Sequence, residues 1–109
     1  MRLNAKLGDE IVCFVAYSLC SEDGVGDYEC FPHKELTLNL AALSERLTGL
    51  GFDIEGVNEQ ICLARKGNLQ LTAFPSGRVI LEGVSPDASD VALKLLADVL
   101  RLEETRLEE

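Results

Sequence analysis

The chain has few of the residues from which catalytic sites are usually built. It contains a single histidine, so a cysteine–histidine nucleophile pair would have to combine His33 with Cys20 or Cys30. Neither a Gly-x-Ser-x-Gly nucleophile elbow nor a Walker phosphate-binding loop occurs in the sequence. No group of residues meets the usual criteria for an active site, and we therefore predict that the protein is not an enzyme.

Long hydrophobic runs are also missing. The longest wholly apolar run covers residues 11–17, far short of the ~20 residues that cross a bilayer as a helix. Residues 1–8 lack the apolar region of a secretory signal. We therefore expect no membrane association and a cytoplasmic location.

Basic residues are scarce, with 10 lysines and arginines against 19 aspartates and glutamates and a net charge of −9. Basic side chains supply most of the non-specific affinity for nucleic acids, so this composition disfavours nucleic-acid binding. We interpret the acidic excess as solvated surface, with a basic protein partner as the alternative. Much of it lies in two clusters, formed by Glu22, Asp23, Asp27 and Glu29 and by Glu103, Glu104, Glu108 and Glu109.

A chain of 109 residues with 47% hydrophobic residues is long enough for one packed core. No internal repeat or low-complexity linker divides it, so we predict a single domain over residues 1–109. Residues 20–34 combine glycines and a proline with polar residues and are predicted to be a loop insertion. Residues 103–109 are predicted to be an acidic tail.

Residues 9–19 have the β-branched and aromatic residues of a strand, and residues 2–7 either form a short strand or fray. Residues 36–38 are predicted to end a strand, after which Asn39 caps a helix that continues to about Thr48. Four strands follow, at residues 52–57, 59–66, 69–74 and 78–84. The final helix is predicted to begin at Ser85 as N-cap, with Pro86 at the first helical position and Asp87 in the first turn.

These elements predict an α+β fold with the order β-α-β-β-β-β-α. The expected architecture is an antiparallel sheet of about five strands with two helices on one face.

This order, with certain short motifs, resembles one repeat of the TATA-binding-protein fold over residues 9–102. The motifs are a Phe-x-Ser-Gly-basic turn at residues 74–78, a strand ending in glycine at residues 79–83 and a serine that starts a helix at Ser85. In that family the uncovered sheet face grips the DNA minor groove and a phenylalanine at the place of Phe74 wedges between base steps. Glu82 and Glu10 depart from the family pattern, and the family's DNA-binding members have two repeats.

The resemblance, with strand alternation, implies which residues face the helices and which face away. Ile11, Cys13 and Val15 are expected under the helices, with Cys62, Leu71, Ala73, Val79 and Leu81. The predicted interaction face consists of Val12, Phe14, Leu63, Arg65, Thr72, Phe74, Ile80 and Glu82.

We predict that this face binds another protein or a second copy, because exposed apolar patches mark interaction sites. A homodimer would form by pairing through an edge strand at residues 10–17. The alternative is that residues 21–34 or the tail fold over the face. Residues 71–83 also resemble C-terminal segments of thiamine- and molybdopterin-type adenylyltransferases, which implies an accessory role in sulfur transfer.

The four cysteines offer a second hypothesis. No C-x₂-C pair occurs, but Cys30 and His33 form a C-x₂-H pair and Cys20 lies in the same segment. These three residues would supply two thiolates and an imidazole to a zinc or iron ion. Cys13 and Cys62 are interpreted as buried hydrophobic residues. A disulfide between Cys20 and Cys30 would require an oxidising compartment.

Overall fold

The computed structural model describes residues 1–108, with side chains described for residues 1–105. It shows an α+β fold in which two helices pack on an antiparallel sheet. The elements are β1 (Arg2–Leu7), β2 (Glu10–Glu22), β3 (Val25–Pro32), α1 (Leu40–Gly49), β4 (Asp53–Val57), β5 (Cys62–Lys66), β6 (Leu69–Ala73), β7 (Val79–Val84), α2 (Ser89–Leu100) and β8 (Glu103–Glu108).

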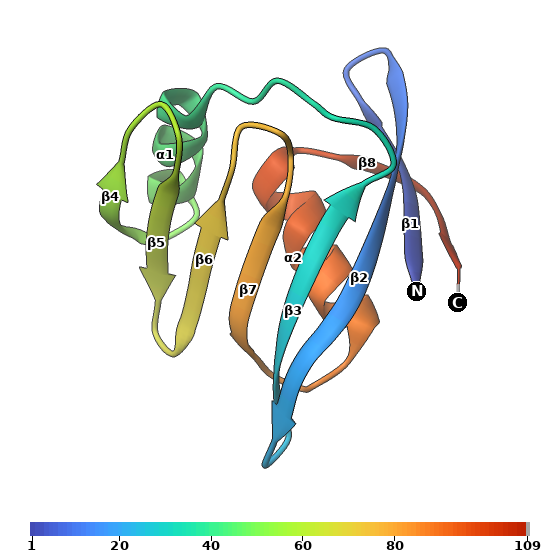
Figure 1. Ribbon diagram of the computed structural model, residues 1–109, viewed down its shortest axis with the longest axis vertical. Helices are drawn as coiled ribbons and strands as arrows, with labels where there is room; N and C mark the ends of the chain where they lie inside the picture. The colour runs from blue at the N-terminus through green and yellow to red at the C-terminus, as the bar shows by residue number, and fades with distance from the viewer. Residues whose placement is uncertain (109) are drawn as a thin grey trace.

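The sheet has eight strands in the order β4-β5-β6-β7-β3-β2-β1-β8, rather than about five. Both helices lie behind it in Figure 1, where α1 contacts β4 and β5 and α2 contacts β1, β2, β3 and β7. The core therefore lies between the helices and one face of the sheet, and no helix or strand among the described residues covers the other face. Among the described residues, no helix is long and apolar enough to cross a membrane.

The region from α1 to β7 follows the predicted pattern closely. Asn39 caps α1, because its side-chain oxygen accepts a hydrogen bond from the Ala42 amide at 3.1 Å. The β6–β7 turn closes with a 3.0 Å bond from the Phe74 amide to the Arg78 carbonyl. Residues 36–38, however, are not a strand. They run as an extended segment whose Leu36 and Leu38 amides donate to the carbonyls of the same turn.

The prediction that residues 20–34 form a loop insertion is wrong. Most of this segment is the end of β2 and the whole of β3, and β3 lies in the interior of the sheet between β7 and β2. Asp23 and Gly24 form the turn, with φ angles of 55° and 78°, and an Asp-Gly pair at positive φ is a typical two-residue hairpin turn. Polar residues hid the alternation of β3, in which the buried residues are Gly26, Tyr28 and Cys30.

The predicted acidic tail is also wrong for the described residues, because residues 103–108 form β8 and pair with β1. Residues 2–7 form β1, which pairs with both β2 and β8. The edges of the sheet are consequently β4 and β8. Glu109, the last residue of the predicted tail, lies outside the described residues.

The final helix begins later than predicted. Helix α2 starts at Ser89 with Ala88 at the N-cap position, and the peptide bond between Ser85 and Pro86 is cis. Asp87 therefore lies before the helix. Its backbone amide donates to the Gly24 carbonyl at 3.0 Å, so the segment before α2 is joined to the β2–β3 turn.

The Asp87 carboxylate strengthens this junction. It accepts hydrogen bonds from the hydroxyls of Ser21 and Tyr28. A Cβ at Gly26 would overlap the Asp87 carboxylate and approach the Tyr28 ring, so a larger residue there would displace these side chains. The bonds from Ser21 and then Tyr28 lower the pKa of Asp87, while burial and then Asp87 raise the pKa of Tyr28 to about 12. We call these residues, Ser21, Tyr28 and Asp87, the hairpin clamp.

Replacing Asp87 by asparagine is expected to lower the free energy of unfolding at neutral pH. The folded-state pKa of Asp87 lies below its ordinary value of 3.8, so the ionised carboxylate stabilises the folded protein above that value. The contribution is lost as the pH falls through the lowered pKa. Urea unfolding at pH 7 and below pH 3 measures both effects, and the difference between wild type and Asp87→Asn should shrink at the acidic pH. Glu45→Gln, which removes the same charge from an exposed position of α1, is the control. A difference that does not depend on pH would contradict this role.

Candidate functional site

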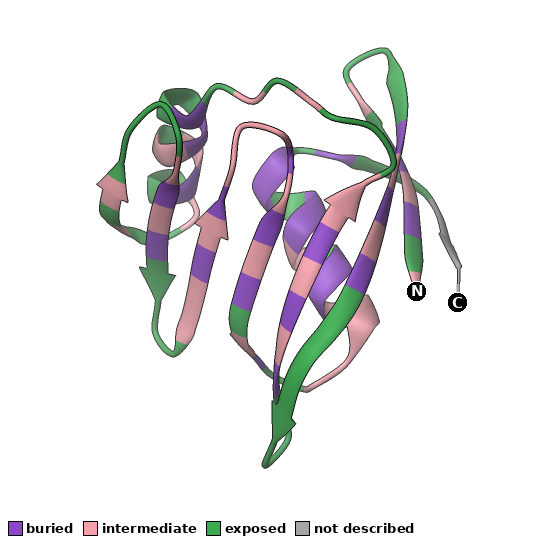
Figure 2. Cartoon of the chain, in the orientation of Figure 1, coloured by how far each residue is buried: buried purple, intermediate pink, exposed green. Residues whose placement is uncertain are grey.

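The face of the sheet opposite the helices, which we call the open face, presents the outward side chains of the strands. One row of this face crosses five adjacent strands. By strand register, Tyr17 lies beside Glu29 and Glu29 beside Ile80. Ile80 in turn lies beside Thr72, and Thr72 beside Leu63. The alternation of buried and half-buried residues along β3 and β7 is visible in Figure 2. One residue from each of five adjacent strands therefore lies in a single row on this face.

The register of β2 differs from the expectation. Val12 and Phe14, predicted on the interaction face, are fully buried against the helix layer. They lie opposite Ala5 and Leu3 of β1, which are also fully buried. Ile11, expected in the core, is 65% exposed. Because residues 11–17 are all apolar, the sequence alternation fits either orientation of this strand equally well.

The outward side of β2 is therefore an apolar stripe of four residues, which we call the β2 stripe: Ile11, Cys13, Val15 and Tyr17. Ile11 and Tyr17 are 65% and 57% exposed. Leu19, 56% exposed, follows at an irregularity where the register with β3 shifts. Three of the most exposed large hydrophobic residues of the described chain thus belong to one strand.

Next to the stripe, the side chain of Arg78, the last residue of the β6–β7 turn, lies between two aromatic rings. Its guanidinium carbon is 5.8 Å from the ring centre of Phe31 and 4.9 Å from that of Phe74. Its Nε donates to the Glu29 carboxylate at 2.6 Å, and the two side chains also form an ion pair. The Phe31 ring meets Tyr17 edge-on, with ring centres 6.0 Å apart. We call Tyr17, Glu29, Phe31, Phe74 and Arg78 the aromatic cluster.

The remaining predicted face residues lie where the alternation of β5, β6 and β7 puts them. Leu63, Thr72, Phe74 and Ile80 are half-buried on the open face, while Arg65 and Glu82 are exposed there. Arg65 donates to Gln70 at 3.1 Å and lies 3.6 Å from the Glu55 carboxylate. Sequence reasoning missed Tyr17, Phe31, Glu29 and Arg78 as parts of this surface. For Phe31 and Glu29 the available signal was the alternation of β3, which its polar and acidic residues masked. Tyr17 was missed because residues 11–17 are apolar on both sides of the strand.

The predicted metal ligands Cys20, Cys30 and His33 are not brought together. Cys30 is fully buried on the helix side of β3, and burial, followed by the charge of Glu29, raises the pKa of its thiol to about 12. Cys20 is exposed near the opposite end of the β2–β3 pair from His33. Within the described residues, no group of three or more histidines, cysteines or acidic residues could hold a metal ion.

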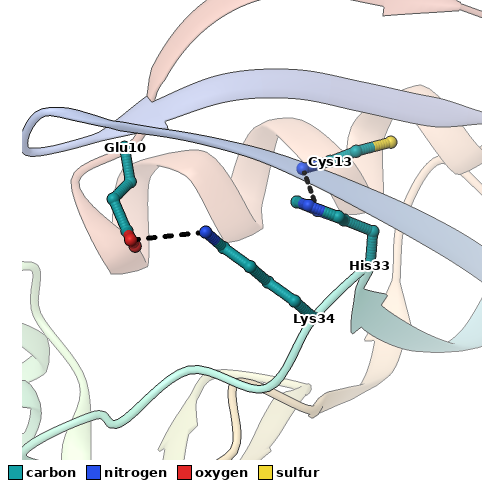
Figure 3. A network of polar contacts seen from close by, with 4 residues as sticks. All are labelled: Glu10, Cys13, His33 and Lys34. Atoms are coloured by element: carbon teal, nitrogen blue, oxygen red, sulfur yellow. Dashed lines mark hydrogen bonds and ion pairs between the residues drawn. The ribbon is translucent and has the colours of Figure 1, made fainter.

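His33 has a structural partner instead. Its Nδ1 accepts a hydrogen bond from the Cys13 amide at 3.0 Å, and its own amide donates to the Cys13 carbonyl at 2.7 Å. Figure 3 shows this pair beside the ion pair between Lys34 and Glu10, with the Cys13 sulfur pointing away from the imidazole. The histidine continues the β2–β3 pairing by one residue and does not activate the thiol.

No protein-family model, curated protein or solved structure matches this chain. The functional argument therefore depends on the surface itself.

Removing the charge of Arg78 tests whether the aromatic cluster is held together by its ion pair. In Arg78→Met, the Glu29 carboxylate, whose side chain is only 16% exposed, loses its hydrogen-bonded cation. We expect the free energy of unfolding to fall by about 1–3 kcal/mol, the usual cost of leaving a largely buried acceptor without its donor. Arg65→Met is the matched control on the same face. In the ion pair between Arg65 and Glu55 both side chains are exposed to solvent, so the pair should contribute less than about 0.5 kcal/mol. Equal losses in urea denaturation would show that the Arg78–Glu29 pair has no special role.

Thiol labelling tests the placement of the cysteines. Burial raises the pKa of both Cys30 and Cys62, so we expect neither to react with iodoacetamide at pH 8 in the folded protein. Cys20 is exposed and should be alkylated first, with Cys13 slower. Mass spectrometry of tryptic peptides reads each site, and a urea-unfolded sample is the control in which all four react. Rapid labelling of Cys30 in the folded protein would contradict its placement in the core.

Proposed function

We propose that this chain is a non-catalytic protein-binding domain that uses the open face of its sheet. The observation that carries this proposal is the exposure of Ile11 and Tyr17 on the β2 stripe. Large apolar side chains usually occur singly on the surface of a monomer, whereas contiguous apolar patches mark interaction sites. Here the stripe adjoins Phe31 and continues across β7 and β6 to Ile80 and Thr72.

The chemistry of the aromatic cluster supports the same function. Tyrosine and arginine are enriched among the residues that contribute most to protein–protein affinity, and phenylalanine is enriched in interfaces. In this chain the Tyr17, Phe31, Phe74 and Arg78 side chains are held by ring contacts and an ion pair before any partner arrives. Such pre-ordering reduces the conformational entropy that binding would otherwise cost.

The charges of the face favour a protein over a nucleic acid. The open face carries four basic side chains, which come from β1, β5 and the β6–β7 turn. It also carries five carboxylates on β3, β4 and β7. A polyanion would meet these carboxylates at close range. The basic residues are Arg2, Lys6, Arg65 and Arg78, and the carboxylates are Asp27, Glu29, Asp53, Glu55 and Glu82.

Our proposal includes a TATA-binding-protein-like half fold in the segment from β3 to α2. Its element order, strand, helix, four strands and helix, is the order that the resemblance implies, with β3 in the place first expected for residues 9–19. Strands β2, β1 and β8 would then extend that unit on one side. We also propose a cytoplasmic location, where a reducing environment suits four free cysteines.

A Tyr17→Asp variant tests the proposed binding face. The tagged chain is purified from extracts of its own cells, and co-purifying proteins, including untagged copies of the chain itself, are quantified by mass spectrometry. We expect genuine partners to fall at least about tenfold with Tyr17→Asp, as for an interface hot spot. Val57→Asp is the control. Val57 is an exposed apolar residue of β4, 44% exposed, and its replacement by aspartate adds the same charge away from the β2 stripe. If both variants retain the same partners, the open face is not the binding surface.

A further inference from the structure

We propose that the partner of the open face is a segment of another protein that carries lysine or arginine side chains beside large apolar ones. This inference rests on the proposed function and names the chemistry of the partner. It differs from the sequence-based expectation, in which two copies continue one sheet through residues 10–17. Residues 10–15 of β2 pair with β1, so that part of the strand is not an edge of the sheet.

The end of the open face nearest the β2–β3 turn, the lower end of the sheet in Figure 1, is acidic. A row of side chains crosses six strands there, one step closer to the turn than the row through Ile80. The Asp27 carboxylate accepts a 3.0 Å hydrogen bond from the Gly83 amide, which joins the β3 and β7 parts of this row. We call it the acidic row, and in strand order it consists of Cys20, Asp27, Glu82, Gln70, Arg65 and Asp53.

Few of the charges at this end of the sheet are neutralised within the chain. Asp27, Asp53 and Glu82 form no ion pair among the described residues, and neither does Glu22 at the end of β2. Arg65 is the one basic side chain of the acidic row. Its guanidinium already contacts the Glu55 carboxylate at 3.6 Å and the Gln70 side chain at 3.1 Å. The row therefore has a net negative charge that a bound cation would compensate.

The helix layer on the opposite side of the molecule has no such excess. Helices α1 and α2, with the residue that follows α2, carry equal numbers of acidic and basic side chains. These are Glu45, Asp90 and Asp98 against Arg46, Lys94 and Arg101. The acidity of the chain is thus concentrated away from the helices. A charged patch on one face steers partners of opposite charge toward that face.

Exposed apolar side chains lie directly beside the acidic row. The neighbouring row begins at Tyr17, which is 57% exposed, and continues through half-buried Ile80 and Leu63. Leu19 and Val25 of the β2–β3 hairpin are 56% and 39% exposed. Adjacent rows on one face of a sheet are roughly 7 Å apart, and neighbouring side chains on one face of a partner strand or helix have a spacing of roughly 5–7 Å. One amphipathic segment therefore reaches both rows, with its cations over the carboxylates.

The same charges disfavour the other classes of partner. Two copies of a chain with a net charge of −9 repel each other at long range. A nucleic acid would bring phosphates toward carboxylates. A wholly apolar surface would bury the carboxylates without supplying hydrogen bonds or charge. A basic amphipathic segment is the partner that covers the apolar row and pairs with the acidic row at once.

Isothermal titration calorimetry of the full chain with a synthetic amphipathic peptide of leucine and lysine tests this chemistry. We expect the peptide to bind. Its affinity should fall at least about tenfold between about 50 and about 500 mM sodium chloride, because salt screens the charge pairs. The same peptide with glutamate in place of every lysine should not bind.

Two triple variants locate the binding site. Glu22→Gln/Asp53→Asn/Glu82→Gln removes three unpaired carboxylates from the acidic end of the sheet and should weaken the lysine peptide at least about tenfold. Glu45→Gln/Asp90→Asn/Asp98→Asn removes the same charge from the helix layer and should bind it as wild type does. Circular dichroism melting confirms that both variants fold. Amide NMR signals of β3 and β7 should shift on binding, and those of α1 should not.

Three results would overturn the inference: no binding of the lysine peptide, equal weakening by both triple variants, or NMR shifts confined to the helices. A wild-type dimer in sedimentation equilibrium would overturn it as well, because the partner would then be a second copy. If cellular partners are nevertheless lost with Tyr17→Asp, the proposed function stands and only the chemistry of the partner is wrong. If they are retained, both proposals fail.

Discussion

The orientation of β2 is the constraint on which the rest of the structure depends. Val12 and Phe14 are fully buried because they pack beside Leu3 and Ala5 of β1 under α2. A slip of one residue would exchange these side chains with Ile11, Cys13 and Val15. Phe14 is among the largest fully buried side chains in the protein, so this exchange would empty much of the core. By fixing Phe14 inward, the fold also fixes Ile11 and Tyr17 outward, and core packing thereby generates the exposed stripe.

The β2–β3 hairpin connects this constraint to the aromatic cluster. Strand β3 pairs with β2 on one side and β7 on the other, which brings Phe31 and Glu29 between Tyr17 and Arg78. The hairpin clamp holds the far end, where Asp87 binds Ser21 and Tyr28. Core-facing Tyr28 and surface-facing Glu29 are neighbours in sequence. One strand therefore serves both the packing of α2 and the architecture of the open face.

The local signals in the sequence were sufficient from α1 to β7. Asn39 as a cap and the four strands of the meander lie within a few residues of their predicted positions, because each depends on contacts between near neighbours in the chain. The prediction failed where long-range pairing decides. Asp87 has the sequence context of a first helical turn, yet it binds a hairpin more than sixty residues earlier. Likewise, Cys20, Cys30 and His33 are close in sequence but are separated by strand alternation and by the length of β3.

The sequence by itself determined that this chain forms an α+β domain with an antiparallel sheet, and that Thr72, Ile80 and Leu63 share the face opposite Cys62, Leu71 and Leu81. Alternation of apolar and polar residues specifies this, because each strand side chain must point to one of two faces. Only the tertiary structure decided the orientation of β2 and the roles of β1, β3 and β8. Residues 11–17 are apolar on both sides, so their alternation carries no information. Strand pairing across the sheet, and the volume available under α2, supplied what the local pattern lacked.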